Sequence, residues 1–494
     1  MNTTKILIVF CFLSIVGLND SLAQQKKLKG SRPNIILVMT DDQGMGDLSC
    51  MGNPILKTPN IDRFYEKSTR LTDFHVSPTC APTRSAIMSG RAPFKNGVTH
   101  TIFQRERMAL DVFTLPQALQ SAGYETGLFG KWHLGDEEEY LPQNRGFDEV
   151  LMHGAGGIGQ QKHGDFPPNS DNTYFDNVLL RNDTIVQTSG FCTDLFFKAG
   201  LAWIKKQHES KNPYFAYIAL NAPHGPMIAP DKYKKRFLDD GYDENTAARY
   251  GMIENIDDNF GMLMQKLEEW NAQENTLVIF MTDNGMSMRP ITKNGEQVER
   301  YNAGLRSYKN SPYEGGTHVP FFMQWKGILG EGVDVNALTA HIDLYKTFCE
   351  LGGVKLPSKM QEMDGRSLLP LLENPNSEWH DRELFVHCGR WKPGERSDAK
   401  YVKCAVRTPQ WRFVNNTELY DITSDPGEQK DVAASNPEVI KRLRKSYDKW
   451  WLSVQPLMVN EGLPVVKPDD QPFAKLYYKQ KQEFGIPSWA PEDL

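Results

Sequence analysis

The chain has 494 residues, of which 24% are charged, and a formal net charge of -6. This length exceeds what one hydrophobic core usually holds, so we expect two domains. The mildly acidic composition excludes a basic nucleic-acid-binding protein, and it means that cations for any anionic substrate must be gathered locally.

The N-terminus has the pattern of an export signal. Lys5 precedes an apolar run over residues 6–18, and small residues at Ser21 and Ala23 follow it. This order predicts a secretory signal peptide in residues 1–23, cut after Ala23. We therefore expect an exported protein, periplasmic or secreted in a bacterium, with no membrane span in the mature chain. A retained signal anchor is the alternative.

Cysteine spacing indicates neither a zinc site nor a disulfide scaffold. Six of the seven cysteines lie outside the leader, and none forms a C-x-x-C pair. Cys388 and Cys404 flank possible strands, and a disulfide between them is one possibility.

Strand-like and helix-like segments alternate through the first three quarters of the chain. Apolar runs typical of strands buried on both faces occupy residues 34–39, 126–129, 214–220 and 276–281. Helical patterns occupy residues 114–122, 192–207 and 247–270. The alternation predicts an α/β fold with a large, mixed, mostly parallel sheet flanked by helices. Ligands bind such sheets at the carboxyl ends of the strands, and all four runs end there in polar or glycine-rich clusters.

The sequence pattern changes after about residue 374. Short strand candidates follow at residues 383–387, 402–406, 411–414 and 418–422, and Asn436-Pro437 then opens a helix. We therefore predict an N-terminal domain over residues 24–374 and a smaller C-terminal α+β subdomain over residues 375–494. The subdomain is built on an antiparallel sheet, and its tail from Gln455 wraps the surface.

Oxygen ligands follow two of the predicted strands. Asp41 and Asp42 come after the first strand and Asp283 and Asn284 after the fourth, and Met-Thr-Asp occurs at both ends. If these strands are neighbours, the four side chains form one site. Hard oxygen ligands without thiolate or imidazole suit Ca²⁺ or Mg²⁺ rather than zinc.

His133 and His224 each follow a different predicted strand, and Lys131 lies two residues before His133. Arg84, Lys131 and Lys309 are candidates to bind an anion held against a divalent cation, and His133 and His224 would divide the acid and base roles. Cys80 lies four residues before Arg84, where a loop enters an apolar helical run. Taken alone, Cys80 is either a structural thiol or a reactive side chain at a helix N-terminus.

Together these residues resemble a known family. Cys80-Ala81-Pro82-Thr83-Arg84 is similar to the C-x-P-x-R signature of type I sulfatases, and Gly130-Lys131-Trp132-His133-Leu134-Gly135 is similar to their second signature. The acidic pairs, His224 and Lys309 match in the family's order, and the resemblance covers nearly the whole mature chain. It is greatest to exported bacterial glycan sulfatases of the alkaline-phosphatase-like superfamily.

The resemblance implies a mechanism. Cys80 would be oxidised to formylglycine by a maturation enzyme, and its hydrated aldehyde would attack sulfur. Arg84 would steady this residue, Lys131 and Lys309 would neutralise charge, His224 with Lys309 would protonate the leaving alcohol, and His133 would take the proton from the remaining hydroxyl. The metal site, with Ca²⁺ expected and Mg²⁺ as the alternative, would comprise Asp41, Asp42, Cys80, Asp283 and Asn284.

The implied substrate is a sulfated oligo- or polysaccharide. Candidate substrate-binding residues are His163, Arg390, Trp391 and His318, of which His318 stands where many family members carry arginine. Trp391 would stack on a sugar ring and Arg390 would bind a carboxylate or a second sulfate, unless Trp391 only packs between domains. The glycine-rich segment 153–160 is a further candidate for specificity, or only a loop.

Two other functions compete with this reading. A phosphomonoester or phosphodiester hydrolase of the same superfamily would need a Ser or Thr nucleophile and more Asp/His ligands, whereas this chain has Cys80 and a single oxygen-ligand set. A non-catalytic glycan-binding homologue would lack catalytic positions, and none is missing.

Overall fold

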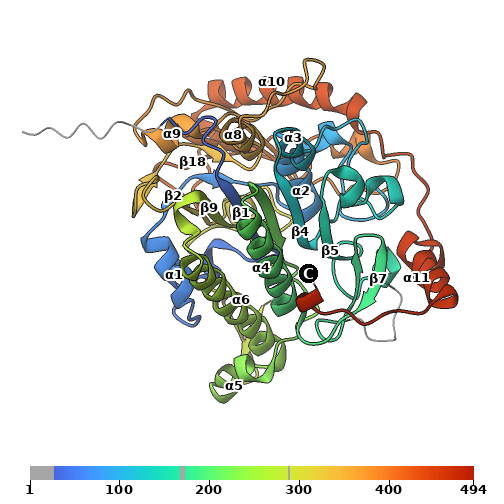
Figure 1. The fold of residues 1–494 in the computed structure, drawn as a ribbon. Coiled ribbons are helices and arrows are strands. Elements are labelled where there is room, and N and C mark those ends of the chain that lie inside the picture. Colours follow the sequence, from blue (N-terminus) through green and yellow to red (C-terminus); the bar gives the residue numbers. More distant parts are fainter. Residues whose placement is uncertain (1–26, 167–172, 288–289, 494) are drawn as a thin grey trace, which may run out of the picture.

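The computed structural model describes residues 27–166, 173–287 and 290–493 (Figure 1). A ten-stranded sheet runs in the order β13-β2-β12-β9-β1-β8-β4-β5-β6-β7. Its five parallel central strands are β9 (Thr276–Thr282), β1 (Asn34–Thr40), β8 (Tyr214–Ala219), β4 (Glu125–Lys131) and β5 (Glu149–His153). The flanking strands are β2 (Thr69–Leu71), β12 (Phe321–Gln324), β13 (Val333–Val335), β6 (Val178–Arg181) and β7 (Thr184–Gln187). Antiparallel pairing of β12 with β9 and of β6 with β5 makes the sheet mixed, as predicted.

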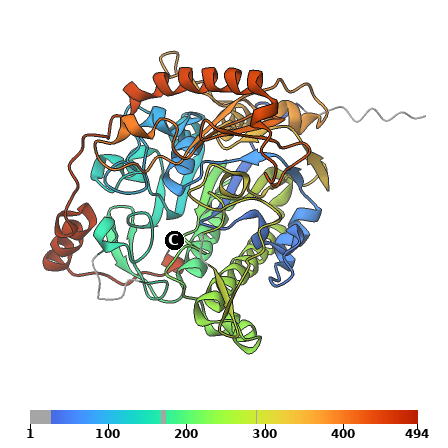
Figure 2. The ribbon, with the colours of Figure 1, turned by 180° about the vertical axis from the view of Figure 1, so that it is seen from behind.

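Alternate residues of the central strands feed two separate cores. In β1, Ile35 and Leu37 join one core, whereas Ile36 and Val38 join the other. Helices α4 (Cys192–Ser210) and α6 (Glu244–Glu269) cover the second core and lie in front of the sheet in Figure 1. The first core is covered from behind by α2 (Cys80–Ser89), α3 (Leu115–Ser121) and α8 (Asp343–Gly352), a side seen in Figure 2. Burial on both faces explains why the predicted strands read as unbroken apolar runs.

The other elements of this part are short. The helices are α1 (Pro59–Glu66), α5 (Asp231–Asp239), α7 (Glu314–Thr317) and α9 (Leu369–Glu373). Two small ladders pair β10 (Ile291–Lys293) with β11 (Glu296–Val298) and β3 (Phe74–His75) with β14 (Thr339–Ala340).

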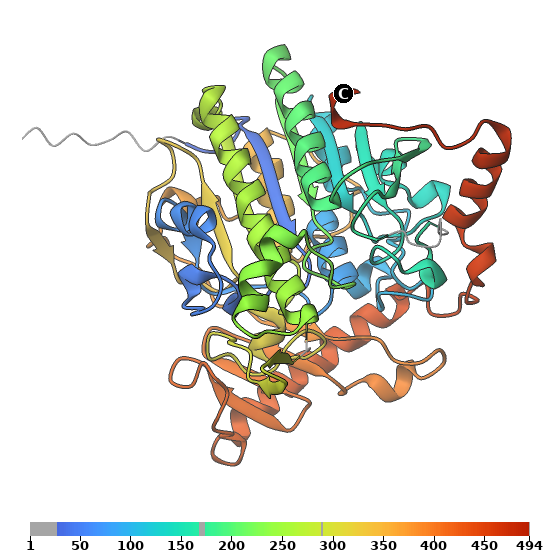
Figure 3. The same cartoon turned by 90° about the horizontal axis from the view of Figure 1, so that it is seen from below.

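Residues 375–494, here called the C-terminal region, contain a separate antiparallel sheet. Its strands are β15 (Leu384–His387), β16 (Cys404–Arg407), β17 (Trp411–Val414) and β18 (Glu418–Asp421). Helix α10 (Pro437–Val454) packs on one face of this sheet. Figure 3 shows this sheet and α10 at one end of the large sheet, whereas α11 (Pro472–Glu483) lies away from them, with Gln480 bonded to Ile185 of β7.

The suggested disulfide between Cys388 and Cys404 is wrong, because both thiols are free. Cys404 of β16 lies opposite His387 of β15, and Cys388 is the next residue along. Successive residues of a strand point to opposite faces, so Cys388 is directed away from Cys404.

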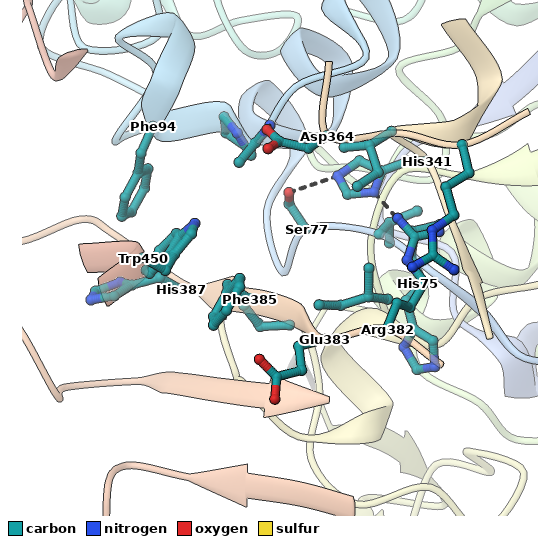
Figure 4. Close-up of a pocket in the computed structure, with 18 residues that line it drawn as sticks. His75, Ser77, Phe94, His341, Asp364, Arg382, Glu383, Phe385, His387 and Trp450 are labelled. Atoms are coloured by element: carbon teal, nitrogen blue, oxygen red, sulfur yellow. Dashed lines mark hydrogen bonds between the residues drawn. The ribbon is translucent and has the colours of Figure 1, made fainter. Parts of the chain in front are cut away.

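A cavity of about 200 Å³ lies between the C-terminal region and the large-sheet part; we call it the junction cavity (Figure 4). Its walls include Phe94, Phe385 and Trp450 on one side and Ser77 and His341 on the other. None of its lining residues belongs to the predicted catalytic set.

Within the described residues, every helix is too short or too polar to cross a membrane. The predicted signal peptide lies outside the described residues.

Candidate active site

The two acidic pairs meet because β1 and β9 are neighbours in register. Met39 lies opposite Met281 and Thr40 opposite Thr282, so Asp41 leaves the sheet beside Asp283. The backbone N–H of Asp42 donates to Oδ1 of Asp283 at 3.3 Å. The expectation that the repeated Met-Thr-Asp ends lie side by side is therefore confirmed.

Cys80 is the first residue of α2 and is buried beside these carboxylates. Potential ligand atoms of Asp41, Cys80 and Asp283 all lie within 4.8 Å of one another. Burial alone would raise the pKa of the Cys80 thiol, but the nearby ammonium groups of Lys131 and Lys309 outweigh it and lower that pKa. The residue thus occupies an electropositive site that is suited to chemistry.

Three cations are fixed by these same carboxylates. Lys131 Nζ lies 2.6 Å from Oδ2 of Asp41, and Lys309 forms an ion pair with Oδ1 of Asp42. Arg84 is fully buried, and its guanidinium donates to Oδ2 of Asp283 at 2.8 Å. A second bond, at 2.9 Å to the carbonyl of Lys131, ties Arg84 to the end of β4.

The oxygen set fits a hard cation. Oδ1 of Asp41 and Oδ1 of Asn284 are buried without a hydrogen-bond partner, and Oε1 of Gln43 shares this state. Burial raises the pKa of Asp41 to about 7 against the opposing charge of Lys131. Buried acceptors without donors are rare in folded proteins, and a divalent cation beside Cys80 would take the free oxygens of Asp41 and Asn284 as ligands. Gln43 was missed from the sequence, although it stands in the polar cluster that ends the first strand.

The two histidines present one ring nitrogen each to the site. Nε2 of His133 donates to the carbonyl of Thr101 at 2.8 Å, which leaves Nδ1 as a buried acceptor without a partner. Nδ1 of His224 donates to the carbonyl of Gly225 at 2.8 Å, and its Nε2 lies 3.9 Å from Oδ2 of Asp42. Burial, opposed by the charge of Asp42, lowers the pKa of His224 to about 4.

Two residues of the site have strained backbone. Asp42 and His133 adopt left-handed backbone angles, with φ of 65° and 62°. This conformation costs a non-glycine residue roughly 1–2 kcal/mol, and such strain is typical of functional sites.

The glycine-rich segment 153–160 lies against both histidines. A Cβ atom on Gly156 would come within 2.5 Å of Nε2 of His133, and one on Gly157 within 3.2 Å of Cε1 of His224. The close approach explains the glycines, because any side chain at position 156 would displace the His133 ring.

The predicted substrate-binding residues do not gather in one place. Arg390 is half-buried and donates to Oγ1 of Thr101 at 2.7 Å, beside the loop that contacts His133. His163 ends a short helical turn and its ring contacts Phe103. Trp391 is buried, and the guanidinium of Arg105 lies 4.8 Å above its ring.

His318 lies outside the Cys80 cluster. Its Nδ1 contacts Oε2 of Glu314 at 2.9 Å, and its Nε2 bonds to the carbonyl of Thr72 at 2.8 Å. Its ring lies over that of His75, with centroids 4.9 Å apart.

Residues 33–354, which hold every predicted catalytic and metal-binding position, match the sulfatase family. The chain belongs to the sulfatase family. A second match, to the C-terminal part of N-sulphoglucosamine sulphohydrolase, covers residues 308–450 of this sulfatase.

The curated relatives of this sulfatase carry the names of enzymes that act on sulfate esters. It is 30% identical to rat N-acetylgalactosamine-6-sulfatase over 76% of this chain and 71% of the relative. It is 28% identical to human arylsulfatase A over 84% of this chain and 86% of the relative. The chain is therefore a sulfatase enzyme.

Solved structures agree with this assignment. Ps i-CgsB, also solved in complex with k-i-k-neocarrahexaose, is 29% identical with a TM-score of 0.73 and covers 86% of this chain and 94% of its own. BT4656, solved in complex with D-glucosamine-2-N,6-O-disulfate, is 19% identical with a TM-score of 0.67 over 86% and 98% of the two chains. At that identity the second likeness concerns the fold alone.

Proposed function

We propose that this sulfatase hydrolyses a sulfate ester of a carbohydrate by means of a formylglycine derived from Cys80. The observation that carries the proposal is the placement of Cys80. It lies buried at the N-terminus of α2, among three carboxylates and the cations Lys131, Lys309 and Arg84. Oxidation of Cys80 would supply a hydrated aldehyde, with one hydroxyl to attack sulfur and a second to release sulfate afterwards.

A divalent cation would be held by Asp41, Asp42, Asp283 and Asn284, next to residue 80. When bound, the cation would polarise the sulfate oxygens and lower the pKa of the hydroxyl groups at residue 80. Ca²⁺ suits this set, with Mg²⁺ as the alternative, because every donor is an oxygen and the site is anionic.

The cationic side chains of this chain would stabilise charge that develops on the sulfuryl group. Lys131 and Lys309 are oriented by their ion pairs with Asp41 and Asp42, so little reorganisation is needed when the anion arrives. Arg84 holds Asp283 and the end of β4, and it therefore fixes the wall of the site.

The two histidines would transfer protons through their ring nitrogens. Nδ1 of His133 is a buried acceptor without a partner, and we assign it the proton of the second hydroxyl of residue 80. His224 and Lys309 both flank the carboxylate of Asp42, and we assign the ammonium of Lys309 as the source of the proton and Nε2 of His224 as the group that passes it to the leaving alcohol.

The substrate class rests on relatives and on the sequence pattern. The neighbour that is 29% identical was solved with a neocarrahexaose, a carbohydrate ligand. We infer a sulfated oligo- or polysaccharide as the substrate. The sequence of residues 1–23 supports export to the periplasm or the medium, where such glycans occur, and oxidation of Cys80 would require a formylglycine-generating maturation enzyme.

Mass spectrometry and activity assays together test the proposal. The peptide containing Cys80, isolated from the native host, should carry formylglycine, and the protein should release sulfate from a panel of defined sulfated saccharides. An aryl sulfate and an aryl phosphate assayed in parallel separate a sulfatase from a phosphatase. Unmodified cysteine in fully active native protein would refute the formylglycine step.

A further inference from the structure

A groove of about 360 Å³ opens beside the catalytic residues; we call it the Arg390 groove. The side chains that matter in it are His100, Asn310, Arg390 and Lys403. Asn310 directly follows the catalytic Lys309, and its backbone N–H donates to the carbonyl of Pro78, two residues before Cys80, at 2.8 Å. The groove therefore adjoins the Cys80 loop.

A second connection runs through the loop that contacts His133. His100 precedes Thr101, whose carbonyl accepts the bond from His133 and whose hydroxyl accepts the bond from Arg390. The backbone N–H of Arg390 donates to the carbonyl of Thr99 at 3.0 Å. A Cβ atom on Gly389 would lie 2.0 Å from that same carbonyl, so the two loops are packed directly together. The groove is thus built from residues adjacent to two catalytic groups.

The two cations of the groove are not neutralised. Arg390 is half-buried and Lys403 is exposed, and neither has a carboxylate partner within the part of the chain that the structure describes. By contrast, Arg84, Lys131 and Lys309 are all paired with carboxylates. Cations without partners on a mildly acidic protein are suited to an anion that comes from outside.

The neutral groups of the groove add directional hydrogen bonds. Nδ1 of His100 accepts backbone bonds at 2.8 and 3.1 Å from the next two residues, so its proton lies on Nε2, which is free to donate. Burial and then the charge of Arg390 lower the pKa of His100 to about 3, which keeps the ring neutral. Oδ1 of Asn310 is buried without a donor. A donor and an acceptor beside two cations match a sugar ring that carries an acidic substituent.

We propose that the Arg390 groove binds a second anionic substituent, a sulfate ester or a carboxylate, on the sugar next to the one that carries the scissile sulfate. This inference rests on the proposed function and narrows its substrates to polyanionic glycans. Cys80 is not among the residues that line the groove, so the groove would contribute to substrate binding and specificity.

The experiment compares matched disaccharides that share one scissile sulfate ester. Their neighbouring sugar is neutral, sulfated or a uronate, and an aryl sulfate serves as a fourth substrate. The variants are Arg390→Asn and Lys403→Asn, because both positions have left-handed backbone, with φ of 64° and 51°, which asparagine tolerates. Lys445→Gln removes the same charge from an exposed site on α10, outside the groove. Lys403→Arg keeps the charge.

The wild type should prefer the anionic disaccharides in kcat/KM. Each asparagine variant should lower this preference about tenfold, as expected for the loss of one charged hydrogen bond, mainly through KM. Lys445→Gln and Lys403→Arg should keep the preference, and salt should weaken it. Preference for the sulfated or for the uronate substrate identifies which anion the groove takes.

Two results would overturn the inference: a wild type without preference for an anionic neighbour, or asparagine variants with an unchanged preference. Both presuppose that sulfate is released from the aryl sulfate. If no substrate is desulfated by formylglycine-bearing protein, the proposed function fails instead.

Discussion

The Cys80 site and the junction cavity differ in whether their buried polar groups are matched, that is, have a hydrogen-bond or ion-pair partner. In the junction cavity, Asp364 pairs with Lys95 at 2.5 Å, and the hydroxyl of Ser77 bonds to His341 at 3.0 Å (Figure 4). Its Arg382 pairs with Asp343 at 2.7 Å. At the Cys80 site, oxygens of three polar side chains and one histidine nitrogen are buried without partners, namely Asp41, Gln43, Asn284 and His133.

Unmatched buried polar groups therefore locate a ligand site better than open space does. A folded chain satisfies nearly all its buried polar groups, so a cluster of unmatched ones is retained for a group from outside. The junction cavity has space, but aromatic packing of Phe94 and Phe385 around Trp450 accounts for its walls. Only the indole N–H of Trp450 is unmatched among its described lining side chains.

The strongest test of this contrast removes the nucleophile. Cys80→Ala should lower kcat by at least about 10³-fold, because no other group can form the covalent intermediate. Its melting temperature should change little, since a small buried side chain is lost. In the junction cavity, Phe385→Leu should keep kcat within about twofold, as a substitution between packed regions acts on stability. Sulfate release and thermal unfolding measured on all three proteins check this; comparable loss of kcat in both variants would contradict it.

A smaller loss of kcat is expected from a substitution in the glycine-rich segment that packs against His133. Gly156→Ala should lower kcat about 10²-fold, because its Cβ would lie within 2.5 Å of the His133 ring and shift a proton acceptor. Gly462→Ala is the matched control, since a Cβ at that position meets nothing within 4 Å. Steady-state kinetics on an aryl sulfate distinguish them, and equal rates for the two variants would show that His133 tolerates displacement.

The central strands and most of the site could be predicted because both are marked locally. Burial on both faces produces unbroken apolar runs, and the repeated Met-Thr-Asp ends of β1 and β9 indicated the ligand cluster before their register was known. The short outer strands, such as β2 and β13, lack this signal, because three residues carry no reliable periodicity. Contacts between distant segments were also out of reach: the packing of Gly156 on His133, and that of Arg105 on Trp391, depend on the folded chain.

Substitutions at the Cys80 site and at the junction cavity should differ in how they change the response of the protein to metal. If the site binds Ca²⁺ as proposed, the ion at 100 times its Kd would stabilise the protein by about 2.7 kcal/mol, so EGTA should lower the melting temperature and abolish sulfate release. Asn284→Ala removes one unmatched oxygen and should reduce the Ca²⁺-induced shift in melting temperature. Asp364→Asn, at a carboxylate already paired with Lys95, should keep that shift in full. Differential scanning fluorimetry with and without CaCl₂ measures it, and an equal shift in both variants would place the cation elsewhere.

The smallest expected effect concerns the ion pair between His318 and Glu314, which exists only while the histidine is protonated. Glu314 accepts from Arg407 at 2.9 Å, from Arg412 at 2.6 Å and from His318 at 2.9 Å, and His75 also faces His318. Burial lowers the pKa of His318, but the charge of Glu314 outweighs it, and the net pKa is raised above 6.5.

A group whose pKa is raised by folding stabilises the protein below its unfolded pKa, and this contribution disappears as the pH rises through the folded pKa. The wild type should therefore lose at most about 1 kcal/mol between pH 6 and pH 9 that His318→Arg retains, because arginine stays charged. The difference in melting temperature between the two proteins should widen by roughly 2 °C over this range. Parallel pH profiles would mean that His318 is already neutral at pH 6, and the ion pair with Glu314 would then be a plain hydrogen bond.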